Sequence, residues 1–170
     1  MKYLHLLKLS IGLLYITSIL ALAFTVCMYI YMLISPTEII LPIVNGTPQD
    51  FFDFDVHAVA LFTFTGFGFF IYGLYWFRKV LSLFSEKIIF EPEVVKYLQL
   101  TGKHFFIAAC LSSIPLYIYK MLVRNEVTMT FGTEGFGSFM FSFGISLFFI
   151  ALAEVFSMAI KMKQENDLTI

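Results

Sequence analysis

The chain has 170 residues, and its composition excludes a water-soluble protein. Hydrophobic residues make up 59% of the sequence and charged residues only 14%, whereas soluble domains carry about a quarter charged residues. The formal net charge of −1 also argues against direct nucleic-acid binding, which needs a basic face that releases counterions. No separate polar region is present, so the length fits one compact membrane domain over residues 1–170.

Four apolar stretches without Asp, Glu, Lys or Arg dominate the sequence. They cover residues 9–35, 56–77, 105–119 and 135–153. A hydrocarbon core about 30 Å thick needs roughly 20 helical residues to cross it. The third stretch is too short on its own, and the helical pattern before it extends the span to residue 98. The sequence therefore predicts an all-α membrane protein, a four-helix transmembrane bundle with spans near residues 9–35, 56–77, 98–119 and 135–160.

The basic residues are sorted between the connecting segments. Nine of the eleven lysines and arginines lie in the amino-terminal segment, in residues 78–103 and in the tail, and only Lys120 and Arg124 lie in the other two loops. The positive-inside rule therefore predicts that both termini and the central loop face the cytoplasm. Residues 36–55 and 120–134 are predicted to face outward.

The loops also carry structural signals. Outside, β-branched residues 38–44 precede the turn pair Asn45-Gly46, and residues 127–131 alternate apolar and polar, which predicts a small extracytoplasmic β-element. Inside, Pro92 between Glu91 and Glu93 is typical of a helix start. A helical apolar stripe also continues past the second span through Val80, Leu81, Phe84 and Ile88. We therefore expect a helical cytoplasmic loop that runs into the third span.

Small residues at helical spacing predict close contacts between the spans, because helices in lipid associate where their backbones can approach. The second span carries Gly66 and Gly73 on one side. Two further seams are Thr17, Ala21 and Thr25 on the first span, and Ser138, Ser142 and Ser146 on the fourth. Packing within one bundle is the favoured interpretation, and a homodimer is the alternative.

Acidic residues gather where the second span enters from outside. Asp53, Asp55 and His57 would point the same way on an extended segment. Such oxygen and imidazole groups can bind a divalent cation. An acidic outer loop without lysine is also what the predicted orientation requires, and we favour that simpler interpretation. The sequence indicates no cofactor.

Glu154 is a carboxylate inside the fourth span. It lies seven residues before Lys161, about 10 Å deep on a regular helix, and acids within membrane spans are functional candidates. One hypothesis pairs it inside the bundle with a basic group of another span. The alternative is a side chain that reaches the cytoplasmic interface. The candidate partners are Arg78, Lys79, Lys103 and His104.

Two segments resemble a known family. The tail contains Glu154 and then Glu165, Asp167, Leu168, Thr169 and Ile170, and the inner loop has Phe90, Glu93, Val94, Leu98 and Gly102 in F-x-x-E-V-x-x-x-L-x-x-x-G order. Both resemble a bacterial family of four-span membrane proteins known as domain of unknown function number twenty-nine seventy-five. The resemblance implies an inner-membrane protein encoded beside a small helix-turn-helix regulator of the Cro/C1 type. It implies no enzyme activity.

The sequence contains no catalytic motif such as G-x-S-x-G, H-E-x-x-H or a Gly-rich phosphate loop, so we do not expect an enzyme. We expect a multi-pass inner-membrane protein with a regulatory or sensory binding role beside the cytosolic regulator, and a small transporter or channel-like protein is the alternative. The terminal Leu168-Thr169-Ile170 is predicted either to bind a partner or to fold back on the inner loop at Phe84, Ile88 and Phe90.

Overall fold

The computed structural model describes residues 2–34, 54–123 and 136–167, and these residues form four long helices. The helices are α1 (Lys2–Ile34), α2 (Phe54–Ser85), α3 (Pro92–Val123) and α4 (Phe136–Asp167). All four are long and apolar enough to cross a membrane, which confirms the predicted spans. The described residues contain no strand. The predicted β-element, at residues 38–46 and 127–131, lies outside them.

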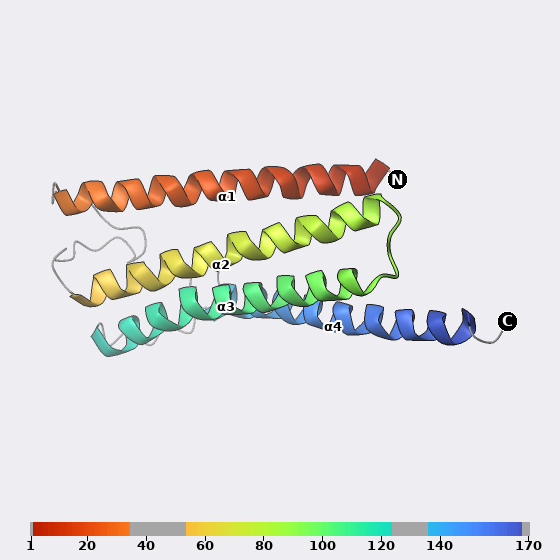
Figure 1. Cartoon of the computed structure of the whole chain (residues 1–170). Helices are drawn as coiled ribbons and strands as arrows, with labels where there is room; N and C mark the ends of the chain where they lie inside the picture. Colours follow the sequence, from red (N-terminus) through yellow and green to blue (C-terminus); the bar gives the residue numbers. More distant parts are fainter. Residues whose placement is uncertain (1, 35–53, 124–135, 168–170) are drawn as a thin grey trace.

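Each helix is longer than the apolar stretch that predicted it. A helix of 32 residues is about 48 Å long, whereas the hydrocarbon core is about 30 Å thick. The surplus lies at one end of the molecule, where the amino end of α1, the α2–α3 loop and the carboxyl end of α4 come together (Figure 1). We call this end the basic end, because lysines and arginines of all four helices and of the α2–α3 loop lie toward it, among them Lys8, Arg78, Lys79, Lys87, Lys96, Lys103, Lys161 and Lys163.

A hydrogen-bonded cap ends α2 and leads directly into α3. The N–H of Ile88 donates to the carbonyl of Leu83 at 2.9 Å, and the N–H of Lys87 donates to the carbonyl of Phe84 at 3.1 Å. This is the Schellman pattern, and Lys87 adopts the left-handed conformation that it requires, with φ 63°. Helix α3 then begins at Pro92. The predicted helix start is confirmed.

Fully buried side chains gather toward the basic end. Val80 of α2 and Val94 and Leu98 of α3 are at most 1% exposed, and they form one cluster with Ala153 of α4. Phe84 of α2 stacks on Phe156 of α4, with ring centroids 5.7 Å apart. The apolar stripe predicted beyond the second span is therefore core up to Phe84. Ile88 lies past the helix end and is partly exposed.

Two predicted seams hold the helices together. A Cβ atom on Gly66 would lie 3.0 Å from the backbone nitrogen of Ser112 on α3, and one on Gly73 would clash with the ring of Phe105. On α4, the carbonyl oxygen of the fully buried Ser146 lies 2.9 Å from the position of a Cβ on Gly102. The prediction that Thr17, Ala21 and Thr25 of α1 contact another helix of the chain is wrong, because all three residues are exposed.

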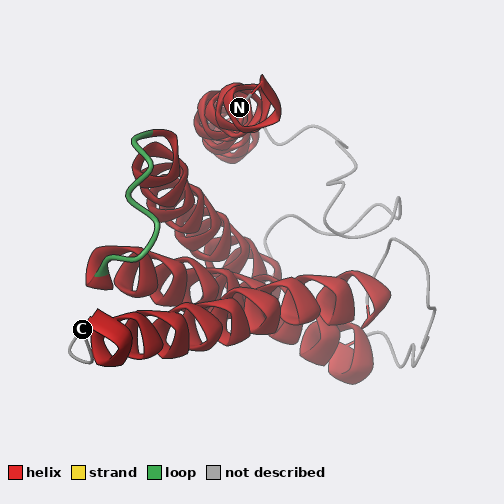
Figure 2. Ribbon diagram, turned by 90° about the vertical axis from the view of Figure 1, so that its right-hand side faces the viewer, coloured by secondary structure: helices red, strands yellow, loops and turns green. Residues whose placement is uncertain are grey.

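The helices pack mainly in chain order. Among the described residues, α1 packs on α2, α2 on α3 and α3 on α4, and α1 has no comparable interface with α3 or α4. Viewed from the basic end, α1 stands apart from those two helices (Figure 2). The predicted four-helix bundle is thus a close-packed set of three helices with α1 attached to one edge.

Candidate functional site

The structure does not assemble the suggested cation site from the residues it describes. Asp55 is exposed in the first turn of α2, where the helix dipole favours a carboxylate, and Asp53 lies outside the described residues. His57 is turned toward α1, with Nδ1 2.6 Å from the hydroxyl of Tyr29. Among the described residues no three His, Cys, Asp or Glu side chains come together. The solvated outer segment, the favoured interpretation, stays a prediction, because residues 35–53 lie outside the described ranges.

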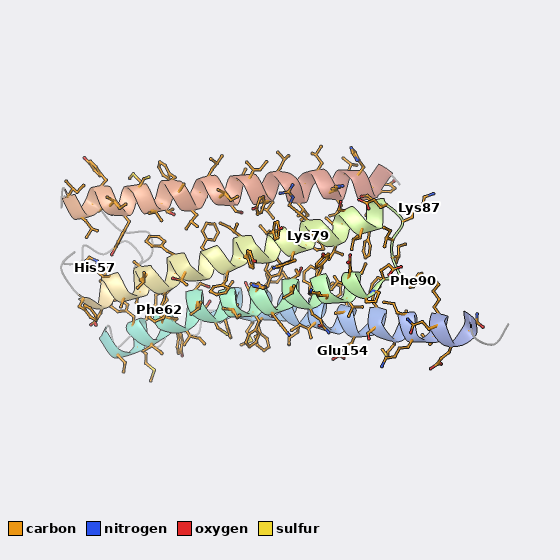
Figure 3. All side chains as sticks on the ribbon, in the orientation of Figure 1. His57, Phe62, Lys79, Lys87, Phe90 and Glu154 are labelled. Carbon is orange, nitrogen blue, oxygen red and sulfur yellow. The ribbon has the colours of Figure 1, made fainter. Side chains whose placement is uncertain are left out.

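Glu154 does not face the bundle. Its neighbour Ala153 is completely buried in the core, and the next residue of an α-helix lies about 100° further round. The Glu154 side chain is accordingly exposed on the outer side of α4 (Figure 3), and no salt bridge with another described residue involves it. The hypothesis of an ion pair inside the bundle is therefore wrong. The alternative, a carboxylate that reaches the membrane interface, fits this position.

The basic candidates for that ion pair lie elsewhere. The ammonium of Lys79 lies over aromatic rings of α2 and α3, 4.8 Å from the centroid of Trp76 and 5.4 Å from that of Tyr97. Cation–π contacts of this kind hold a lysine at a membrane interface without a carboxylate. Arg78 turns the other way, and its guanidinium lies 4.8 Å from the centroid of Tyr15 on α1.

The inner-loop residues of the predicted family segment divide into two groups. Val94, Leu98 and Gly102 follow one face of α3 at helical spacing and are buried against neighbouring helices. Phe90 and Glu93 are exposed before and within the first turn of α3. The first group therefore maintains the fold, and the second lies on the surface of the basic end.

The tail residues continue this surface. Helix α4 runs past the α2–α3 loop at the basic end (Figure 1), and residues 161–166, which include Glu165, are all exposed. The ammonium of Lys163 lies 5.9 Å from the ring centroid of Phe90. Asp167 is the last residue of α4, and Leu168, Thr169 and Ile170 lie outside the described residues. Both predictions for those three residues therefore remain predictions.

An exposed apolar patch marks the α2–α3 loop. Ile88, Ile89 and Phe90 are 38%, 39% and 47% exposed, although they lie beyond the apolar part of both neighbouring helices. We call these three residues the loop patch. Charged, exposed side chains surround it in sequence and in space: Glu86, Lys87, Glu91, Glu93 and Lys163.

A long apolar groove lies between α1 and α4, with α2 and α3 at its base. Its lining residues fall within residues 11–32, 63–77, 105–112 and 142–149, and its volume is about 870 Å³. Ligand pockets measure roughly 300 to 1,000 Å³. We call it the lateral groove. The sequence did not reveal it, because its lining comes from four helices whose relative rotations the apolar stretches leave undetermined.

Comparison with known proteins identifies a family. The family model described as "Protein of unknown function (DUF2975)" matches residues 19–170. It covers the inner-loop and tail segments and also most of the first span, and it confirms the resemblance. No curated protein and no solved structure matches the chain.

Proposed function

We propose, from the premise that this chain belongs to the family Protein of unknown function (DUF2975), that it is a membrane-embedded regulatory protein that binds a cytosolic helix-turn-helix regulator of the Cro/C1 type. The membrane is the bacterial inner membrane, and the basic end faces the cytosol. The loop patch is the observation that carries the proposal. It supplies the binding surface, together with the exposed end of α4.

The loop patch lies where the protein leaves the lipid. Arg78 and Lys79 precede it on α2, and lysines and arginines gather on the cytosolic side of membrane proteins. Ile88, Ile89 and Phe90 therefore face water, where a contiguous exposed apolar patch marks an interaction site. The charged residues around the patch can set the register of a partner without supplying most of the affinity.

The same surface connects to the membrane-embedded helices. Phe84, four residues before the patch, stacks on Phe156 of α4, and Lys163 covers Phe90. A shift of α4 along α2 would therefore move both parts of the binding surface together. This connection supports a sensory role. Transport of an ion is the less supported alternative, because none of the residues that line the lateral groove is charged.

Binding is tested with a purified Cro/C1-type regulator from the same genome and the full-length protein in nanodiscs. Ile89→Ser combined with Phe90→Ser should weaken binding about 30-fold or more, because one buried aromatic anchor such as Phe90 contributes at least about 2 kcal/mol. Leu6→Ser is the matched control, because Leu6 is 59% exposed on α1 at the same end. Equal binding by the double variant and the control, or no binding by the wild type, would reject the proposal.

Topology is tested separately with reporter fusions. Fusions after Lys87 and Ile170 should report the cytoplasm, and fusions after Asn45 and Asn125 should report the outside, because of the asymmetry of lysines and arginines. The amino end of α1, the α2–α3 loop and the carboxyl end of α4 all lie at the basic end (Figure 1), which supports this expectation. A cytoplasmic signal after Asn45 would contradict it.

A further inference from the structure

We propose that the lateral groove binds an anionic phospholipid, with its acyl chains along the apolar lining and its phosphate on Arg78 and Lys8. This inference is independent of the proposed regulator, because it concerns residues within and at the edge of the bilayer. It rests on the length of the groove, on the chemistry of its lining, and on two cations that extend that lining at the basic end.

The groove has the length of the hydrocarbon core. On α1 its lining runs from Ile11 to Met32, which is about 32 Å along a helix. Half of that length matches one leaflet of a bilayer about 30 Å thick. Lipid in either leaflet can reach the groove from the side, because α1 and α4 border it without a comparable interface between them.

The chemistry of the lining favours an alkyl chain over a polar ligand. Three of its five hydroxyl groups donate within their own helices: Thr25 to the carbonyl of Ala21 at 3.0 Å, Thr63 to that of Val59 at 2.8 Å, and Ser112 to that of Ala108 at 2.8 Å. Seven of the 21 lining residues are phenylalanines, and they come from all four helices. An apolar occupant therefore leaves none of these three hydroxyl groups without a hydrogen bond.

Two cations continue the lining rows at the basic end. Lys8 lies three residues before the lining residue Ile11 on α1, and Arg78 lies four residues after the lining residue Leu74 on α2. Residues three or four apart share a helix face. Along the helix axes, Lys8 lies about 4.5 Å beyond Ile11, and Arg78 lies about 1.5 Å beyond Phe77, the last lining residue of α2. The two cations therefore mark the basic end of the groove, where the headgroup of a seated lipid would lie. Both side chains are exposed.

Arg78 is well suited to a phosphate. Its guanidinium lies on the ring of Tyr15, and within the described ranges no salt bridge involves it. Its planar set of N–H donors can bind a phosphate through two parallel hydrogen bonds. Lys8 lies about one helical turn further toward the basic end, because its Nζ is 3.3 Å from the hydroxyl of Ser82, four residues beyond Arg78. That hydroxyl also lies 3.5 Å from a carboxylate oxygen of Glu86. Glu86 directly follows the last residue of α2, eight residues beyond Arg78, so this carboxylate lies further toward the basic end than the guanidinium does. Basic groups between transmembrane helices bind anionic headgroups in this way.

The experiment measures retained lipid and melting temperature of the delipidated protein in neutral detergent. Added phosphatidylglycerol should bind and raise the melting temperature more than phosphatidylcholine of the same chain length. Arg78→Gln should weaken phosphatidylglycerol binding about fivefold or more and remove the difference between the two lipids. Lys103→Gln is the matched control, because it removes the same charge from an exposed position of α3.

A second variant tests the groove itself. Thr25→Trp places a large ring in the groove from the exposed side of α1 and should abolish lipid retention, whereas Ala23→Trp, which is exposed and not part of the lining, should not. The proposal is overturned if both lipids bind equally to the wild type, if Arg78→Gln behaves as Lys103→Gln does, or if inorganic phosphate stabilises as much as the lipid. A lipid-free dimer that Thr25→Trp disrupts would overturn it in favour of a second copy of the chain.

Discussion

Replacement of Gly102 by alanine is expected to destabilise the protein by about 1 to 3 kcal/mol, the usual cost of inserting a methyl group into a close-packed contact. The added Cβ would lie 2.7 Å from Cγ1 of Ile150, 2.9 Å from the carbonyl oxygen of Ser146 and 3.1 Å from the backbone nitrogen of Ile150. Two of these atoms belong to the backbone of α4, so relief requires α3 and α4 to separate. Gly102→Val should have a larger effect. Unfolding by sodium dodecyl sulfate in mixed micelles gives the measurement.

Gly144→Ala is the matched control on α4. No atom lies within 4 Å of a Cβ at that position, so the substitution adds a methyl group without a clash. Alanine also favours a helix over glycine by about 1 kcal/mol in water. The control should therefore be neutral or slightly stabilising. Equal losses in Gly102→Ala and Gly144→Ala would show that the contact between α3 and α4 at Gly102 does not account for the loss.

Leu98→Ala is expected to destabilise the protein by about 2 to 5 kcal/mol, as truncation of a fully buried leucine does. Leu98 is 1% exposed within the cluster formed with Val80, Val94 and Ala153. It lies seven residues before Phe105, about 10 Å along the helix from the apolar stretch of α3. At that position unfolding exposes the side chain toward water, so the hydrophobic effect adds to the loss of packing.

The control for Leu98 is Leu122→Ala on the same helix. Leu122 is 71% exposed, so Leu122→Ala removes the same atoms from the surface of α3. The unfolding free energy of this variant should stay within about 0.5 kcal/mol of the wild type. The two alanine variants are compared in the same detergent titration. A Leu98→Ala protein as stable as Leu122→Ala would mean that the cluster at the basic end is not packed as described.

The sequence was sufficient for the elements that depend on local chemistry. Charge-free stretches predicted the four spans, Pro92 predicted the start of α3, and Gly66 and Gly73 predicted the side of α2 that meets another helix. Each of these signals is a property of a few neighbouring residues, and the structure places each as expected.

The sequence did not predict how each helix is rotated about its axis or which side chains of other helices it contacts. The spacing from Glu154 to Lys161 set a depth in the membrane, but the direction of the carboxylate depends on how α4 turns against α3. The aromatic partners of Lys79 likewise include Tyr97, which comes from a different helix. On α1 the only predicted packing face, Thr17, Ala21 and Thr25, is exposed. The lateral groove depends on which face of α1 meets α2, and the local sequence did not indicate that face.

Among the described residues α1 has its main interface with α2, and this bears on the order in which the helices assemble in the membrane. Helix α1 is synthesised first, and because it is stable in lipid as an isolated span, it can wait in the bilayer without a partner. The remaining three helices complete their contacts only after α4 has been made, since α3 packs on both α2 and α4. Assembly of the protein is therefore completed only when α4 has been made. A chain arrested before α4 would expose the face of α3 that carries Gly102 to lipid and to quality-control proteases.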